Sequence, residues 1–229
     1  MLETVHYADR YREFVSAEAA ERQQYVLAGS HLVRSGNGAL LNVAPLFGPH
    51  GQLVHEHAKS HLFPFEHPLG VSEGDQMDVI ELPFARVGVN ICYEAEIPEC
   101  AAALAEQRPD HPLPVPDTLG GGLLARAALR RSSGDRESGL RRPLRRGQRP
   151  TGPWPGAWAR SAVLGLCDTG WPHDGVLAET ATNIEAAAIA PIDPDLLAAN
   201  RESGSATTFA DRRRRSELYR TWPSHLRFS

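Results

Sequence analysis

The 229-residue sequence predicts one α/β domain, in which helical and extended segments alternate along the chain. Three observations predict this class: an early segment with helical periodicity, a pair of strands flanking a turn signal, and a strand that runs into a helix start. The apolar fraction of 41% is ordinary for a globular protein with a real core.

The first element is a helix over about residues 7 to 23, followed by a strand. Its apolar positions at helical spacing are Tyr7, Tyr11, Phe14 and Val15. We expect these side chains to share the buried face of the helix. The run Tyr25–Ser30 (YVLAGS) is typical of a buried strand.

A hairpin is predicted next. Two extended apolar runs, Leu40–Phe47 and Gln52–His55, flank the turn signal Gly48-Pro49-His50-Gly51. Lys59 follows the second strand. It is the only lysine in the chain, which carries 24 basic residues.

A strand that ends at Cys92 follows the hairpin. We expect a strand over Met77–Leu82, a break at Pro83, and a second strand over Arg86–Cys92, where apolar and small residues alternate. The stretch Pro98–Gln107 is typical of a helix, because proline is favoured in the first turn.

The composition changes abruptly after Gln107. Residues 108–155 hold ten arginines, eight prolines and seven glycines, with no Phe, Tyr, Ile or Met, so they cannot build a core strand. We expect strands around Ser161–Leu166 and Ala186–Ile192. The predicted domain spans residues 1–195, with 108–155 atypical, and residues 196–229 form a C-terminal helix and tail.

Three residues make a candidate site. Cys92 lies where a strand turns into a helix, and such an elbow exposes a thiol beside backbone N–H groups that can hold an oxyanion. Lys59 supplies a cation, and Glu66 lies seven residues further on, placed to orient or neutralise it. Taken singly, a cysteine at a strand end is more often a small core residue, a lysine is most often exposed, and the spacing of Lys59 and Glu66 means little.

Taken together, the motifs resemble the nitrilase superfamily of carbon–nitrogen hydrolases. The matching segments, in order, are Tyr25–Ser30, Asn42-Val-Ala44, Pro49-His-Gly51, Lys59–Glu66 and Gly88–Glu99. The stretches DTGWPHDGVLAE and DRRRRSELY are similar to the late hairpin and closing helix of that family.

The resemblance implies a fold, a reaction and a site. The fold would be a nitrilase-like αββα sandwich, here incomplete. The reaction would be hydrolysis of a small amide, less favourably a nitrile, through a thioester on Cys92, without cofactor or metal. Lys59 and the backbone N–H of Tyr93 would face the developing negative charge, Glu66 would support Lys59, and a homo-oligomer is expected.

Two departures from the family pattern are visible. No F-P-E motif supplies the general-base glutamate, and the resemblance would place it ahead of Met1, in an N-terminally truncated chain. We also hypothesise that residues 108–155 are translated out of frame, because codons can be chosen whose shifted frame encodes a family-like strand and ENQ helix. The genomic DNA decides between this and a true insertion, such as a disordered arginine-rich linker.

Whole-chain properties narrow the alternatives. The net charge of −4, the lack of a long apolar run and the three irregularly spaced cysteines predict a cytoplasmic protein without a membrane or nucleic-acid partner. A metal site among the histidines near Lys59 stays open, as do an inactive family remnant and an arginine-rich module binding an anionic partner through residues 126–149. The histidines concerned are His55, His57, His61 and His67.

Overall fold

The computed structural model describes residues 2–107, 161–182, 184–205, 211 and 214–221. Contacts divide the chain into two compact units. The first contains the described residues up to Gln107, Ser161 and the segment from Thr180 to Ala187. The second contains Ala162–Glu179 and the described residues after Ala187.

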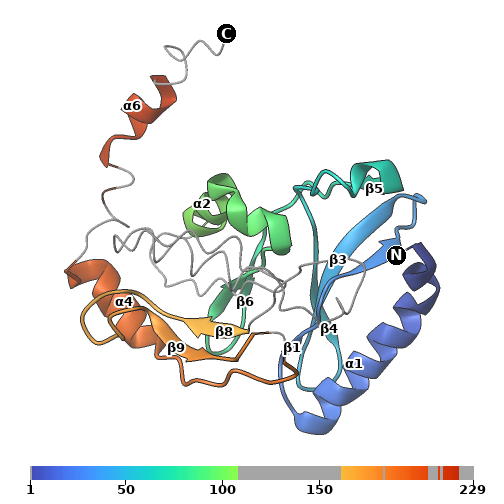
Figure 1. Ribbon diagram of the computed structural model, residues 1–229, viewed down its shortest axis with the longest axis horizontal. Coiled ribbons are helices and arrows are strands. Elements are labelled where there is room, and N and C mark those ends of the chain that lie inside the picture. Colours follow the sequence, from blue (N-terminus) through green and yellow to red (C-terminus); the bar gives the residue numbers. More distant parts are fainter. Residues whose placement is uncertain (1, 108–160, 183, 206–210, 212–213, 222–229) are drawn as a thin grey trace, which may run out of the picture. The chain divides into compact units, whose positions relative to one another are not determined.

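The first unit holds two α-helices and seven strands among its described residues (Figure 1). Its helical elements are η1 (Leu2–Tyr7), α1 (Ala8–Arg22), η2 (His67–Leu69), η3 (Cys92–Glu96) and α2 (Pro98–Glu106). Its strands are β1 (Val26–Leu27), β2 (His31–Arg34), β3 (Leu40–Phe47), β4 (Leu53–Ala58), β5 (Val71–Ser72), β6 (Val79–Glu81) and β7 (Arg86–Gly88). The predicted α/β class is confirmed.

Strand β3 is the centre of a five-stranded sheet. It pairs antiparallel with β1, β2 and β4 and parallel with β5. The predicted hairpin is confirmed, although β4 runs three residues further than expected, to Ala58. Gly51 closes its turn at φ +78°, a left-handed conformation that glycine adopts without strain. The longer β4 places Lys59 directly after the strand.

Helix α1 packs on this sheet through a narrower face than the sequence predicted. Its buried residues are Ala8, Val15 and Ala19, and Val15 and Ala19 pack with Phe47 of β3 and with Ala28, which follows β1. Tyr7 and Phe14 are 60% and 63% exposed, so the expectation that they lie on the buried face was wrong. Small alanines bring the helix backbone close to the sheet, and the larger aromatic side chains then point outward.

The strand leading to Cys92 is shorter than predicted. Strand β7 pairs antiparallel with β6 and ends at Gly88, so Cys92 begins η3 rather than ending a strand. Val89 and Ile91 nevertheless stay buried, in a cluster with Ala44 and Leu46 of β3. Apolar packing on β3 therefore holds the approach to Cys92 without a continuous hydrogen-bonded ladder.

Among its described residues, the second unit holds a two-stranded sheet and two helices: β8 (Ala162–Leu164), β9 (Val176–Glu179), α4 (Pro194–Ser203) and α6 (Ser216–Thr221). The strand near Ser161–Leu166 is confirmed. The strand expected at Ala186–Ile192 is absent among the residues described there, and Ile189 is 86% exposed. β9 instead supplies the partner strand, because the turn around Trp171–Gly175 folds the chain back onto β8.

Two predictions fall outside the described residues. The out-of-frame hypothesis for residues 108–155 and the arginine-rich module at 126–149 both lie there. In the part of the chain that is described, no helix is both long and apolar enough to cross a membrane.

Candidate active site

Lys59 and Glu66 form a buried ion pair. Lys59 Nζ lies 2.5 Å from Glu66 Oε2, and the two residues are 2% and 3% exposed. Glu66 also accepts hydrogen bonds from Asn42 Nδ2 at 3.0 Å and from the backbone N–H of Phe63 at 2.7 Å. A buried charge is tolerated when it is paired and hydrogen-bonded in this way. The predicted pairing of Lys59 with Glu66 agrees with this geometry.

The backbone around Lys59 is fixed from two sides. Its N–H donates to the Asn42 carbonyl of β3 at 2.9 Å, and its own carbonyl accepts from the N–H of Gly74 at 2.8 Å. The bond to Asn42 continues the β3–β4 pairing by one residue. The ammonium group therefore extends from a sheet edge that the hairpin has already positioned.

Cys92 adopts an unusual backbone conformation. Its φ is +52°, and among the described residues only Gln23, the cap of α1, is another non-glycine residue with positive φ. A left-handed non-glycine residue costs about 1 to 3 kcal/mol and persists only where its surroundings impose it. The Cys92 side chain is exposed at this sharp turn, as a nucleophile requires.

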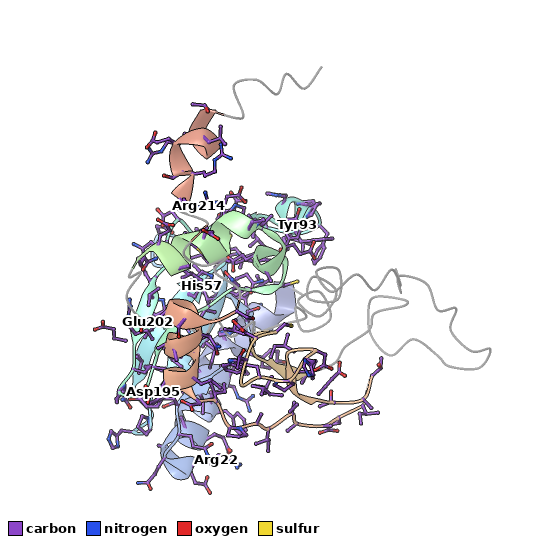
Figure 2. All side chains as sticks on the ribbon, turned by 90° about the vertical axis from the view of Figure 1, so that its left-hand side faces the viewer. Arg22, His57, Tyr93, Asp195, Glu202 and Arg214 are labelled. Carbon is purple, nitrogen blue, oxygen red and sulfur yellow. The ribbon has the colours of Figure 1, made fainter. Side chains whose placement is uncertain are left out.

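Glu94, two residues after Cys92, is completely buried. Its Oε2 accepts from the backbone N–H of Ile91 at 2.5 Å and lies 2.9 Å from Nε2 of His57. Its Oε1 accepts from both the backbone N–H and the hydroxyl of Ser60, each at 2.6 Å. Figure 2 labels His57, a residue of β4, and Tyr93, which lies in η3.

The protonation of Glu94 follows from these contacts. Burial by itself raises the pKa of this carboxyl, but hydrogen bonds and charge from His57, with further bonds from Ser60 and Ile91, hold the pKa below its ordinary value. The side chain is therefore a carboxylate at neutral pH. Because a carboxylate only accepts hydrogen bonds, His57 donates to it from Nε2.

The Lys59 loop and the Cys92 turn contact one another. Ser60, adjacent to Lys59, donates twice to Glu94, and the rings of Phe63 and Tyr93 meet edge to face with centroids 5.3 Å apart. The N–H of Phe63 is also bonded to Glu66. Residues 60–66 thus join the ion pair to the turn that carries the thiol.

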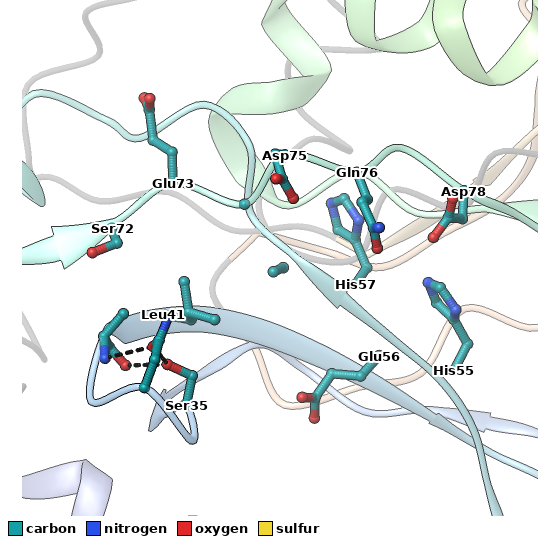
Figure 3. A pocket seen from close by; sticks show the side chains of 14 residues that line it. Ser35, Leu41, His55, Glu56, His57, Ser72, Glu73, Asp75, Gln76 and Asp78 are labelled. Atoms are coloured by element: carbon teal, nitrogen blue, oxygen red, sulfur yellow. Dashed lines mark hydrogen bonds between the residues drawn. The ribbon is translucent and has the colours of Figure 1, made fainter.

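A cavity of about 480 Å³ lies beside this region and includes His57 in its wall (Figure 3). Cys92, Lys59 and Glu66 do not line it. Its walls carry four carboxylates, Glu56, Glu73, Asp75 and Asp78, together with His55. Across the described residues, no group of three or more His, Cys, Asp or Glu side chains is arranged to hold a metal ion.

The sequence indicated part of this arrangement. It predicted the neighbourhood of Lys59 and Glu66 and a turn at Cys92, and it identified His57 only as one of four nearby histidines. It missed Glu94, whose partners His57 and Ser60 lie 37 and 34 residues away along the chain. The available signal was that Glu94 occupies the third position of a helix start. A glutamate there often accepts a hydrogen bond from the N–H of the N-cap residue, here Ile91.

A comparison with protein families assigns this segment. Residues 6–110 match the family model described as carbon-nitrogen hydrolase. Over this segment, a little under half of the chain, the sequence is similar to carbon-nitrogen hydrolases. The predicted resemblance to the nitrilase superfamily is confirmed for the part of the chain that contains Lys59, Glu66 and Cys92.

Two curated proteins are similar to this chain in sequence. The probable hydrolase YhcX of Bacillus subtilis is 27% identical over 91% of this chain and 41% of its own length. Omega-amidase NIT2 of Xenopus tropicalis is 34% identical over 42% of this chain and 40% of its own length. The chain spans about two fifths of the length of these relatives.

Two solved structures match about half of the chain. A carbon-nitrogen hydrolase from Helicobacter pylori G27 matches with a TM-score of 0.45 and 23% identity, over 50% of this chain and 39% of the other. An amidase from Nesterenkonia matches with a TM-score of 0.44 and 24% identity, over 56% and 49% of the two chains.

Proposed function

We propose that this carbon–nitrogen hydrolase cleaves small amides, and nitriles less readily, through a covalent intermediate on Cys92. The observation that carries the proposal is the left-handed, exposed Cys92 in a family-matched segment, joined through residues 60–66 to the buried Lys59–Glu66 pair. The omega-amidase relatives support amides as the substrate class.

The proposed reaction proceeds in two balanced steps. The Cys92 thiolate attacks the carbonyl carbon, the carbon–nitrogen bond breaks, and the nitrogen leaves with an added proton as ammonia or an amine. Water then attacks the thioester, releasing a carboxylic acid and the thiol. Lys59 and the backbone N–H of Tyr93 stabilise the negative oxygen of each tetrahedral intermediate.

Glu66 serves in this proposal as the partner of Lys59, not as the base. Its carboxylate is already bonded to Lys59, Asn42 and the N–H of Phe63, so it has little capacity to take the thiol proton. An ordinary thiol has a pKa of about 8.5, which leaves a few per cent ionised at neutral pH. A general base at another residue would contribute about 10² to 10⁴ to the rate.

The test is release of ammonia from a series of short-chain amides and the matching nitriles. Wild type is expected to act on amides, and Cys92→Ala is expected to abolish that activity. Cys167→Ala, which removes an exposed thiol of the second unit, is the matched control and should leave the rate unchanged. A folded wild-type protein that releases no ammonia would instead identify an inactive member of the family.

A homo-oligomeric state and a cytoplasmic location belong to the same proposal. The first is supported by the family affiliation of residues 6–110, and the second by three cysteines at irregular spacing. Light scattering of the purified full chain tests the oligomeric state.

A further inference from the structure

We propose that Glu94 is the positioning residue of the Cys92 site: its carboxylate fixes the thiol-bearing turn relative to Lys59. This inference rests on the proposed function, because it assigns a role within the same site. Glu94 does not contact the reacting atoms in this account; it acts through the backbone on either side of them.

The two carboxylate oxygens reach opposite halves of the site. Oε2 accepts from the N–H of Ile91, the residue before Cys92, at 2.5 Å. Oε1 accepts from the N–H and hydroxyl of Ser60, the residue after Lys59, at 2.6 Å. One rigid, fully buried group therefore spans the neighbours of both candidate catalytic residues.

The same residue closes the turn that contains Cys92. The backbone N–H of Glu94 donates to the Ile91 carbonyl at 3.2 Å, while the Glu94 carboxylate accepts from the Ile91 N–H. Cys92 and Tyr93 lie between these two bonds. A left-handed residue costs about 1 to 3 kcal/mol and persists only where its surroundings impose that conformation. The two bonds between Ile91 and Glu94 provide such surroundings for Cys92.

The chemistry of the site requires a carboxylate rather than an amide. All the groups around Glu94 that bond to it are donors: the N–H groups of Ile91 and Ser60, the Ser60 hydroxyl and the His57 ring. A glutamine would offer one accepting oxygen and turn an NH₂ group toward another donor. The hydrogen bonding would then be lost on one side, either to Ile91 beside Cys92 or to Ser60 beside Lys59.

Glu94→Gln in the full chain tests the role through two readouts. The first is the rate of Cys92 alkylation by iodoacetamide, with Cys167 of the same molecule as an internal reference. The second is amide hydrolysis, resolved into kcat and KM. We expect the alkylation rate and kcat each to fall by about 10- to 100-fold, because small displacements of a reacting group lower its rate by such factors. KM should stay within about twofold of the wild-type value.

Two further variants separate positioning from folding. Glu96→Gln changes an exposed glutamate in the same short helix, and it should leave both readouts as in wild type. Glu94→Asp keeps two accepting oxygens and should recover most of the lost kcat. If Glu94→Gln does not fold, Ser60→Ala removes one hydroxyl donor and is expected to change Cys92 alkylation about threefold or more.

The outcomes are distinct. The positioning role would be overturned if Glu94→Gln folds and its Cys92 alkylation rate and kcat stay within twofold of wild type. If Glu94→Gln does not fold, the role would be overturned by a Ser60→Ala variant whose Cys92 alkylation rate equals that of wild type. If wild type hydrolyses no amide but Cys92 alkylation still responds to Glu94→Gln and not to Glu96→Gln, the proposed function fails while control of Cys92 by Glu94 stands.

Discussion

Glu66 and Glu94 are both buried carboxylates, yet their surroundings satisfy them in different ways. Glu66 bonds directly to the charged side chain of Lys59. Glu94 is held by two backbone N–H groups, a hydroxyl and the ring of His57. The comparison separates two tasks: Glu66 balances a buried charge, whereas Glu94 sets where the backbone of two loops lies.

The largest expected effect is that of removing the charge of Glu66. Glu66→Gln leaves the Lys59 ammonium buried without its counter-charge, so the free energy of unfolding should fall by about 3 to 5 kcal/mol. Urea denaturation measures it. Lys59→Met combined with Glu66→Leu removes both charges and should recover most of the loss, since an apolar pair of similar size is often neutral.

A partly exposed ion pair provides the control for this prediction. Arg12 and Glu56 bond to each other with side chains 30% and 28% exposed. Glu56→Gln should cost about 1 kcal/mol or less, because solvent screens such pairs. An equal effect of Glu56→Gln and Glu66→Gln would contradict the view that burial makes the Lys59–Glu66 pair special.

The contribution of the Glu94 carboxylate to stability should decrease at acid pH. A carboxylate whose pKa is lowered by folding contributes stability above its unfolded pKa of about 4.5, and that contribution is lost as the pH falls through the folded value. His57 and Cys100 are the titratable groups that interact with it. The stability difference between wild type and Glu94→Gln should therefore shrink below about pH 4.5.

Urea denaturation of the two proteins at pH 7 and at several values below 4.5 measures this difference. Glu96→Gln, which changes an exposed glutamate of the same short helix, is compared in the same way as the control. A difference for Glu94→Gln that stays constant from neutral to acid pH would mean that the ionised carboxylate does not stabilise the fold.

The smallest expected effect concerns the strained backbone itself. Cys92→Gly should raise the free energy of unfolding by about 0.5 to 1 kcal/mol, because glycine adopts positive φ without a steric cost. Gln23→Gly, at the left-handed cap of α1, is the matched control. In a Glu94→Gln background, Cys92→Gly should raise the free energy of unfolding by less. An equal rise in both backgrounds would mean that Glu94 does not impose the strain at Cys92.

Much of the first unit was predictable because its signals are local. The boundaries of α1, β3 and α2 follow from periodicity, a turn signal and a proline in the first turn. The buried face of α1 did not follow, because the fit against Ala28 and Phe47 favours small alanines over the larger Tyr7 and Phe14.

The site was predictable only where its partners are close in sequence. Lys59 and Glu66 lie seven residues apart in one loop, so their pairing follows from spacing and family resemblance. The positive φ of Cys92 and the role of Glu94 depend on donors from β4 and the following loop, which sequence periodicity does not relate to η3. Local bonds between Ile91 and Glu94 close that turn, and the long-range donors His57 and Ser60 hold the Glu94 carboxylate in place.

The most direct test of the central claim is covalent trapping of an acyl group on Cys92. Wild-type protein is incubated with a short-chain amide, quenched in acid, digested and mapped by mass spectrometry. The account predicts an acyl adduct on the peptide containing Cys92, none on that containing Cys167, and no adduct in Cys92→Ala. A folded wild-type protein that turns over the amide without such an adduct, or an adduct that persists in Cys92→Ala, would contradict it.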